Sequence, residues 1–414
     1  MTESIARSSK ELLKKFLSGI LVFAFIRLKG VIYIPMLSYF LSKSQVGDVG
    51  FLNNIANLVV PILLLNLPDS ANRHVLDHQD RGVSAEPVYR VIAATAKLAL
   101  LLMVLLFAGA LLFADAATIG LYAYLLCVSA ARAFQKLSVY KMEILQYSKD
   151  LIRYNVKFEY LPLIPILAYL ALLFDQSIFP IGLSILIVGS LISVSAIKEV
   201  FRVSFKNFNT PLFMELFKVS LFLMPALYAQ LLMQSSDLII VKAVLGSTET
   251  GDFVVANSIA ALFMVVSSGL AFFWYSSVKY MSKSVVRKVV IGMPLALPIL
   301  SGIVWAVTHF GVNLIQSYFW KEYQLVQLAP VLAMFYIQLA FVQVLSGILY
   351  AAGEERVIFK GSLIGLTVNL VMGYLLITEY GLIGAGFSSV SASLVLVAFY
   401  IYSIFSRKVL QEES

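Results

Sequence analysis

The sequence has 414 residues, of which 60% are hydrophobic and only 13% are charged, and its formal net charge is +8. A typical soluble domain has about 25% charged and about 45–50% apolar residues. So large an apolar fraction cannot be hidden inside a water-soluble globule, which excludes a soluble enzyme, a disordered chain and a disulfide-rich secreted module. The single cysteine, Cys127, has no partner for an internal disulfide. The composition predicts an all-α polytopic membrane protein.

The apolar segments are long enough to cross a membrane, because a spanning helix needs roughly 20 mostly apolar residues. In chain order the first six spans are predicted near residues 17–41, 49–72, 89–113, 118–141, 154–174 and 179–198. After a basic stretch at about 199–211, six more are predicted near 213–243, 252–277, 288–311, 325–351, 357–377 and 383–405. The first segment is too long for the apolar region of a signal peptide, and no small-residue cleavage site follows it. We therefore expect about 12 transmembrane helices.

Lysine and arginine residues gather at one side of these predicted spans. Of the 31 cations, 24 fall at the two termini and in the loops after every second span, whereas the opposite loops hold only Lys43, Lys242 and Lys321. Because cytoplasmic loops carry an excess of Lys and Arg, both termini are predicted to be cytoplasmic. The opposite loops are short and leave no room for a soluble catalytic domain. Basic residues that flank spans also explain the net charge without a nucleic-acid partner.

The two halves of the sequence are similar at a constant offset of about 204 residues. The segment Leu41–Leu58 aligns without a gap with Leu245–Leu262 and shares seven of 18 residues with it. The same offset pairs Gly182 with Gly386. Six spans separate equivalent points, so both halves enter the membrane in the same direction. The repeat predicts an N-terminal six-helix lobe at 1–205 and a parallel C-terminal lobe at 206–414, around a central cavity that opens to alternate sides.

Four cations fall well inside the predicted spans, all in the first half: Arg27, Lys29, Lys97 and Arg132. Each costs about 2.5–3.5 kcal/mol at mid-bilayer unless it is solvated or paired. The positions 204 residues later are uncharged: Leu231, Met233, Ser301 and Tyr336. The cations are therefore a feature of the first lobe, and they predict a cationic cavity for an anionic substrate.

Two details qualify this cationic cavity. Arg27 and Lys29 lie about 200° apart around a helix, so only one of them is expected to face the cavity. The long cationic side chains can also reach the membrane surface, or pair with Glu159 or Asp69. Both interpretations of the deep cations stay open at this point.

Uncharged polar and acidic residues also fall inside spans. Asn53 and Asn57 in the second span, with Asn257 in the eighth, could bind sugar hydroxyls or join neighbouring helices by hydrogen bonds. The match of Asn53 with Asn257 at the repeat offset favours the second role. Glu159 and Asp69 are candidates for binding a coupling ion, H⁺ or Na⁺, as is Asp237, which is predicted near the outer end of its span. Each carboxylate is equally well explained as an interfacial group.

No catalytic constellation is recognisable. His74 and His78 stand four residues apart in RHVLDHQD, but the HExxH zinc pattern is absent, and so is a Walker A sequence. We expect no metal site, no cofactor and no enzymatic activity.

Four segments carry a resemblance to a known family. They are IPMLSYFLSKSQVGDVGF in and after the first span, LNLPDSANR at the end of the second, DLIIVKAVLGSTETGDFVVANSI around the seventh and eighth, and EYGLIGAGFSSVSAS near the C-terminus. With twelve spans in two parallel lobes, the chain resembles the multidrug/oligosaccharidyl-lipid/polysaccharide (MOP) exporter superfamily. Within it, the chain most resembles the bacterial polysaccharide-repeat-unit (O-antigen) flippases. The resemblance covers nearly the whole chain, although each motif is degenerate.

The resemblance implies a function in the bacterial cytoplasmic (inner) membrane. An undecaprenyl-pyrophosphate-linked oligosaccharide would pass from the inner to the outer leaflet, for O-antigen, capsule or exopolysaccharide biosynthesis. It also implies a cationic lumen, with a polysaccharide polymerase and a chain-length regulator as partners. Since the chain lacks a nucleotide-binding motif, we expect alternating access coupled to H⁺ or Na⁺.

Two alternatives belong to other classes of protein. A drug/cation antiporter of the same superfamily would prefer acidic cavity residues, whereas the deep charges here are positive. A membrane glycan polymerase would be an enzyme, and such enzymes carry a sizeable external loop, which this sequence lacks.

Overall fold

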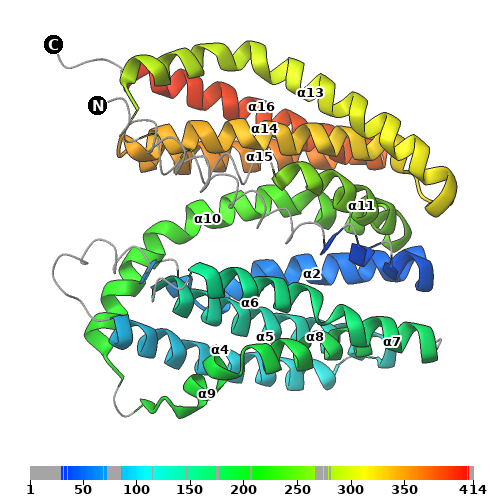
Figure 1. The fold of residues 1–414 in the computed structure, drawn as a ribbon, viewed down its shortest axis with the longest axis vertical. Coiled ribbons are helices and arrows are strands. Elements are labelled where there is room, and N and C mark those ends of the chain that lie inside the picture. The colour runs from blue at the N-terminus through cyan, green and yellow to red at the C-terminus, as the bar shows by residue number, and fades with distance from the viewer. Residues whose placement is uncertain are drawn as a thin grey trace. The chain divides into compact units, whose positions relative to one another are not determined.

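The computed structural model describes residues 29–30, 32–34, 36–68, 70–71, 85–113, 115–144, 148–173, 177–205, 208–265, 274, 278, 281–407 and 409. Every regular element in these ranges is a helix (Figure 1). Seven of the described helices are long and apolar enough to cross a membrane, or eight if one bent pair counts as a single span. The predicted class, an all-α polytopic membrane protein, is confirmed.

The chain folds into two compact units. The first, Tyr39–Tyr228, is called the early unit, and the second, Ala229–Ser414 with the described residues up to Ser38, is called the late unit. The early unit contains α2 (Lys43–Leu63), α4 (Ala85–Leu111), α5 (Ala116–Ile144), α6 (Ser148–Tyr160), α7 (Leu163–Leu173), α8 (Phe179–Ile192) and α9 (Val194–Arg202). The late unit contains α11 (Ser247–Ala260), η3 (Ala261–Phe263), α13 (Lys283–Phe319), α14 (Leu325–Ala351), α15 (Glu355–Tyr380) and α16 (Leu382–Ser406). The 35-residue helix α10 (Thr210–Val244) contributes its first half to the early unit and its second half to the late unit.

Two predicted spans are not single straight helices in the structure. The segment predicted at 154–174 is interrupted by a turn at Leu161–Pro162 between α6 and α7, because proline lacks the amide hydrogen that the helix needs there. Residues Arg153–Leu172 are nevertheless long and apolar enough to form one span, as predicted. The segment predicted at 179–198 bends by 80° between α8, which ends at Ile192, and α9.

The core of the early unit lies where α4, α5 and α9 meet the start of α10. Val88, Ile92 and Ala96 are spaced four residues apart on α4 and are fully buried, and they pack with Leu137 of α5 and Val200 of α9. This spacing places one apolar face of α4 against its neighbours. On the far side of α4, residues such as Leu105 are exposed, as expected for a surface that meets lipid tails.

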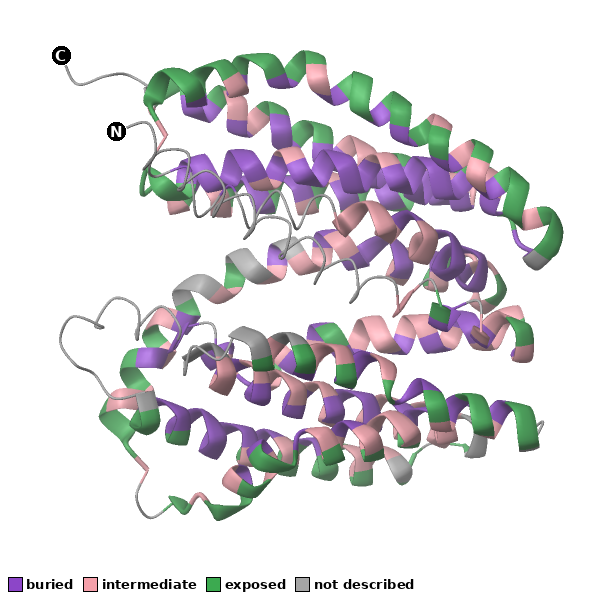
Figure 2. Ribbon diagram, in the orientation of Figure 1, coloured by how far each residue is buried: buried purple, intermediate pink, exposed green. Residues whose placement is uncertain are grey.

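The late unit is arranged around α14. This helix is buried along nearly its whole length, whereas much of α13 is exposed (Figure 2). It packs on α11, α13 and α16, and α15 packs closely along α16. A Gly361-x-x-x-Gly365 pair on α15 allows this approach, because a Cβ at Gly361 would lie 2.2 Å from Cε1 of Tyr400 and one at Gly365 would lie 2.3 Å from Cδ1 of Leu396.

Candidate functional site

Arg132 belongs to a buried polar cluster in the early unit. Its Nη1 donates hydrogen bonds to Oε1 of Glu159 at 2.6 Å and to Oε1 of Gln135 at 2.7 Å. The Gln135 amide donates to the same Glu159 oxygen at 3.1 Å. The guanidinium carbon also lies 5.8 Å from the centre of the Phe158 ring, within range of a cation–π contact.

Local sequence explains how this cluster forms. Gln135 follows Arg132 by three residues on α5, so both lie on one helix face. Glu159 is the penultimate residue of α6, just before the Leu161–Pro162 turn. Its side chain is only 7% exposed, against 26% for Arg132, and the guanidinium offsets the cost of burying this carboxylate. Of the two interpretations open for Arg132, the structure shows the pair with Glu159.

Lys97 lies elsewhere in the same unit. Its Nζ donates to the backbone carbonyls of Phe201, at 3.4 Å, and Val203, at 3.2 Å, and lies 5.5 Å from the centre of the Phe205 ring. These carbonyls are at the C-terminal end of α9, where cations stabilise a helix. The ammonium predicted to line a cavity therefore stabilises the end of α9.

The first-span cations are only partly described. Lys29 is half-buried, with its Nζ 5.5 Å from the centre of the Tyr33 ring. Arg27 and the candidate ion-coupling residue Asp69 lie outside the described residues.

The asparagine positions differ between the units. In the late unit, Asn257 on α11 accepts a hydrogen bond from the Tyr336 hydroxyl on α14 at 2.8 Å, which is the helix-joining role. In the early unit Asn53 is half-buried on α2 and Asn57 is exposed. Tyr336 is the repeat counterpart of Arg132, so the position that holds a tyrosine hydroxyl in one half holds a guanidinium in the other.

The structure also reveals a polar cluster in the late unit that sequence reasoning undervalued. Asp237 on α10 is 2% exposed, although the sequence predicted it near the outer end of a span, as a coupling site or an interfacial carboxylate. Its two oxygens accept hydrogen bonds from Ser388 at 2.7 Å, from Ser389, and from the Asn369 amide at 3.4 Å. Among the described residues no lysine or arginine pairs with Asp237. In the sequence, the adjacent serines on α16 and the lone asparagine on α15 could have indicated that Asp237 has buried hydrogen-bond partners.

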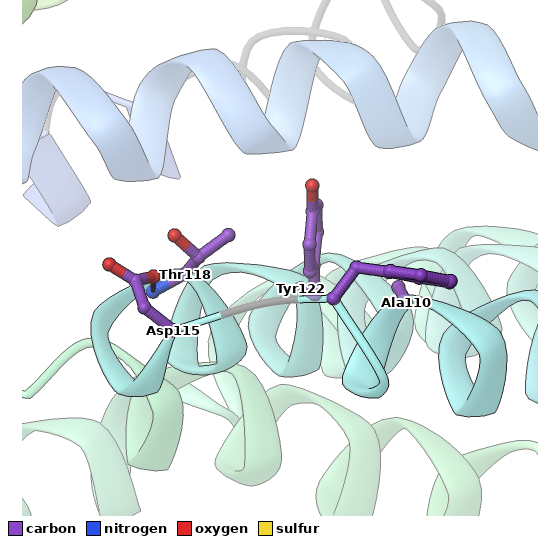
Figure 3. Close-up of a pocket in the computed structure, with 5 residues that line it drawn as sticks. Ala110, Asp115, Thr118 and Tyr122 are labelled. Carbon is purple, nitrogen blue, oxygen red and sulfur yellow. Dashed lines mark hydrogen bonds between the residues drawn. The ribbon is translucent and has the colours of Figure 1, made fainter.

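A third feature is an open hollow of about 330 Å³ where α4 turns into α5, lined by Ala110, Phe113, Asp115, Thr118 and Tyr122. Figure 3 shows Asp115, Thr118 and Tyr122 along the start of α5. Oδ1 of Asp115 accepts the Thr118 amide at 2.9 Å, and hydrogen bonds from Thr118 hold the pKa of Asp115 below its usual value. This carboxylate caps α5, and the hollow offers a ligand both polar groups and aromatic rings.

The described residues contain no group of three or more His, Cys, Asp or Glu side chains that could hold a metal ion. His74 and His78 lie outside the described ranges. What the described helices provide is therefore two buried polar clusters, one in each unit: a cation held by a carboxylate, and a carboxylate held by neutral donors.

Solved structures share this fold at low sequence identity. The MATE multidrug transporter DinF-BH matches with a TM-score of 0.70 and 16% identity, covering 97% of this chain and 96% of that chain. An inward-facing MATE family transporter of the MOP superfamily matches at 0.64 and 13%, covering 94% and 95%. The lipid II flippase MurJ in an inward closed conformation matches at 0.57 and 15%, covering 95% and 89%.

No protein-family model matches the sequence, and no curated protein matches it significantly. The structural matches therefore establish fold and nothing finer. MATE transporters and MurJ have 12 transmembrane helices in two lobes. The chain therefore has the fold of these MATE transporters and of MurJ.

Proposed function

We propose that the protein is a flippase of the bacterial cytoplasmic membrane that moves an undecaprenyl-pyrophosphate-linked oligosaccharide by alternating access. The transporter fold supports this class of function, and one of the structures with this fold is the lipid II flippase MurJ. Both termini are proposed to be cytoplasmic, from the distribution of Lys and Arg.

The observation that carries the proposal is the contrast between Arg132 and its repeat counterpart Tyr336. In the late unit this position makes a neutral hydrogen bond to Asn257. In the early unit it holds a guanidinium, with 26% of the side chain exposed, on a helix that packs against the α2 helix of Asn53. A helix-joining role does not need a charge here, because the other half fulfils it without one. A guanidinium suits a pyrophosphate or an acidic sugar, since its donors fit two anionic oxygens at once.

The mechanism that we propose is the sharing of the Arg132 guanidinium between Glu159 and the substrate. Glu159 and Gln135 hold Arg132 in the substrate-free protein, which keeps the buried cation neutralised. A pyrophosphate oxygen then binds other N–H groups of the guanidinium, while Nη1 keeps its hydrogen bonds to Glu159 and Gln135. When the glycan leaves on the far side, Arg132 returns to its pair with Glu159 alone. No covalent bond forms or breaks.

Coupling to H⁺ or Na⁺ is proposed at Asp237 rather than at Glu159, which the ion pair already occupies. The Asp237 carboxylate is buried among hydroxyl and amide groups that can donate a hydrogen bond to the carboxylate or turn an oxygen lone pair toward a bound cation. An ionised carboxylate without a cation is costly in this environment. Binding of H⁺ or Na⁺ to Asp237 would therefore favour one conformation of the protein over another.

The test uses cells in which this gene is deleted and surface glycan is restored by plasmid copies. We expect Arg132→Gln and the double variant Arg132→Gln/Glu159→Gln both to lose surface glycan, with the double variant present at normal protein level. Glu159→Gln alone should retain glycan display. A matched control removes the exposed pair Arg407–Glu354, whose Nη1 and Oε2 atoms are 2.7 Å apart, by the same two glutamine changes and should leave display unchanged.

Normal glycan display by the Arg132→Gln/Glu159→Gln variant would show that Arg132 serves only to neutralise Glu159, and would overturn the proposal. Efflux of cationic dyes without any change in surface glycan would instead identify a drug antiporter.

A further inference from the structure

The helix α9 leaves the membrane-spanning direction before its span is complete. The preceding α8 has 14 residues and is therefore about 21 Å long, whereas the hydrocarbon core is about 30 Å thick. At Ser193 the chain bends by 80°. If α8 begins at one face of the hydrocarbon core, α9 lies about 9 Å inside the other face and runs nearly along the membrane plane.

Two lysines of the early unit hold α9 in this position. Lys97 on α4 binds the carbonyls at the C-terminal end of α9, as described above. Lys141 on α5 forms an ion pair with Glu199 and lies 3.5 Å from the Ser195 hydroxyl, with its Nζ 5.6 Å from the centre of the Tyr89 ring. The inner side of α9 is buried in the core. The bend is thus fixed at both ends of a nine-residue helix.

The outward side of α9 combines apolar and cationic side chains. Val194 and Phe201 lie close together on one helical face, and they are 46% and 65% exposed. Lys198 and Arg202 are one turn apart on the adjoining face, where Arg202 is exposed. Glu199 does not cancel their charge, because it is turned to Lys141. The outward surface therefore presents apolar groups beside two positive charges.

We propose that α9 is an interfacial helix whose outward face binds the headgroups of anionic phospholipids. Its depth fits the 5–10 Å at which amphipathic helices lie in the headgroup–acyl boundary. Phe201 and Val194 contact the upper acyl chains, while Lys198 and Arg202 contact the phosphate groups. The charge of this face matches an anionic lipid. The proposal does not depend on the substrate that is transported.

The position of α9 is tested by fluorescence. In a Cys127→Ala background, which removes the only cysteine, Phe201→Cys is labelled with bimane and the protein is placed in phosphatidylcholine vesicles. We expect stronger quenching by nitroxide at acyl carbon 5 than at carbon 12. Leu105→Cys, at an exposed site within α4, should show the opposite order. Quenching of the Phe201→Cys label by aqueous iodide alone, or by neither quencher, would place α9 in water or under protein and overturn the proposal.

The lipid preference is tested with the same label. Nitroxide phosphatidylglycerol should quench it more than nitroxide phosphatidylcholine at equal mole fraction, with an apparent association at least about threefold higher. Lys198→Gln with Arg202→Gln should abolish this preference. Lys283→Gln with Arg287→Gln, an exposed pair of equal spacing and charge on α13, should preserve it. An unchanged preference in the first variant, or an equal loss in the control variant, would overturn the proposal.

Discussion

At the scale of single residues, a charge inside a predicted span has a meaning only once its neighbours are known. The sequence showed that Arg132 was deep and that Glu159 was one of two acidic partners within reach. It could not choose, because the two residues are 27 positions apart on helices whose packing depends on the Leu161–Pro162 turn. Lys97 could not be assigned at all, since its acceptors are backbone carbonyls of a helix 104 residues further on.

The Arg132–Glu159 pair predicts an asymmetry between single and double variants. Arg132→Ala leaves a 7% exposed carboxylate without its cation and should lower the free energy of unfolding by about 3–5 kcal/mol. Arg132→Gln/Glu159→Gln replaces the ion pair by two neutral amides and should recover most of that loss. Thermal unfolding in detergent measures both. Equal destabilisation by the single and the double variant would show that the unpaired Glu159 carboxylate is not the cause of the lost stability.

Lys97 gives a second prediction at this scale. Lys97→Met keeps most of the apolar stem but removes the ammonium from the end of α9, so the segment after Arg202 should become more accessible to limited proteolysis. Lys97→Arg should restore protection, because a guanidinium can donate to the same carbonyls of Phe201 and Val203. Equal cleavage rates in the wild-type protein and Lys97→Met would show that the contact does not hold α9.

At the scale of helices, most elements could be predicted because hydrophobic length alone defines them. The predicted span at 325–351 coincides with α14, and the predicted spans at 357–377 and 383–405 lie within α15 and α16. The end of α8 was missed because neither proline nor glycine marks Ser193. The sequence could have indicated this end by a change in composition. Apolar residues predominate in α8, whereas charged residues interrupt the apolar ones in VSAIKEVFR.

The close packing of α15 on α16 predicts a contrast between two glycines. Gly361→Ala places a methyl group 2.2 Å from Cε1 of Tyr400 and should destabilise the protein by about 1–3 kcal/mol. Gly302→Ala on α13 meets no atom within 4 Å and should be neutral or stabilising by up to about 1 kcal/mol. Melting temperatures of the two purified variants would separate these outcomes. A tolerated Gly361→Ala would mean that Tyr400 moves aside without cost.

At the scale of the whole molecule, the repeat at offset 204 stays a prediction, and equivalent positions can be compared in the structure. The helix α2 begins at Lys43 and α11 begins at Ser247, which are 204 residues apart. A Cβ at Gly182 would lie 3.1 Å from Cα of Tyr124, and one at Gly386 would lie 3.6 Å from Cδ1 of Leu328, the counterpart of Tyr124. The compact units nevertheless divide the chain at Ser38 and Tyr228, so the first described residues are grouped with the late unit rather than with the half to which the sequence assigned them.

Coupling of transport to an ion gradient is a property of the whole transport cycle. A variant of Asp237 tests it. Asp237→Asn preserves the size of the side chain and most of its hydrogen bonds with Ser388 and Ser389, so the protein should fold. We expect glycan headgroup translocation in reconstituted vesicles to lose its response to an imposed H⁺ or Na⁺ gradient while a gradient-independent rate remains. Ser220→Ala, at a buried serine of the early unit, is the control. An undiminished gradient response in Asp237→Asn would locate coupling elsewhere.

The deep burial of α14 has a consequence for synthesis in the cell. The buried amide of Gln338 accepts its hydrogen bond from Ser393 of α16, which is 55 residues further along the chain. At about 5–20 residues per second, α14 must wait for roughly 3–11 seconds after its own translation before that partner emerges. During this interval the membrane holds a helix with a polar side chain that no later helix yet covers. A chain that stops between α15 and Ser393 would stay permanently in this exposed state, which makes it a substrate for membrane proteases rather than a shortened transporter.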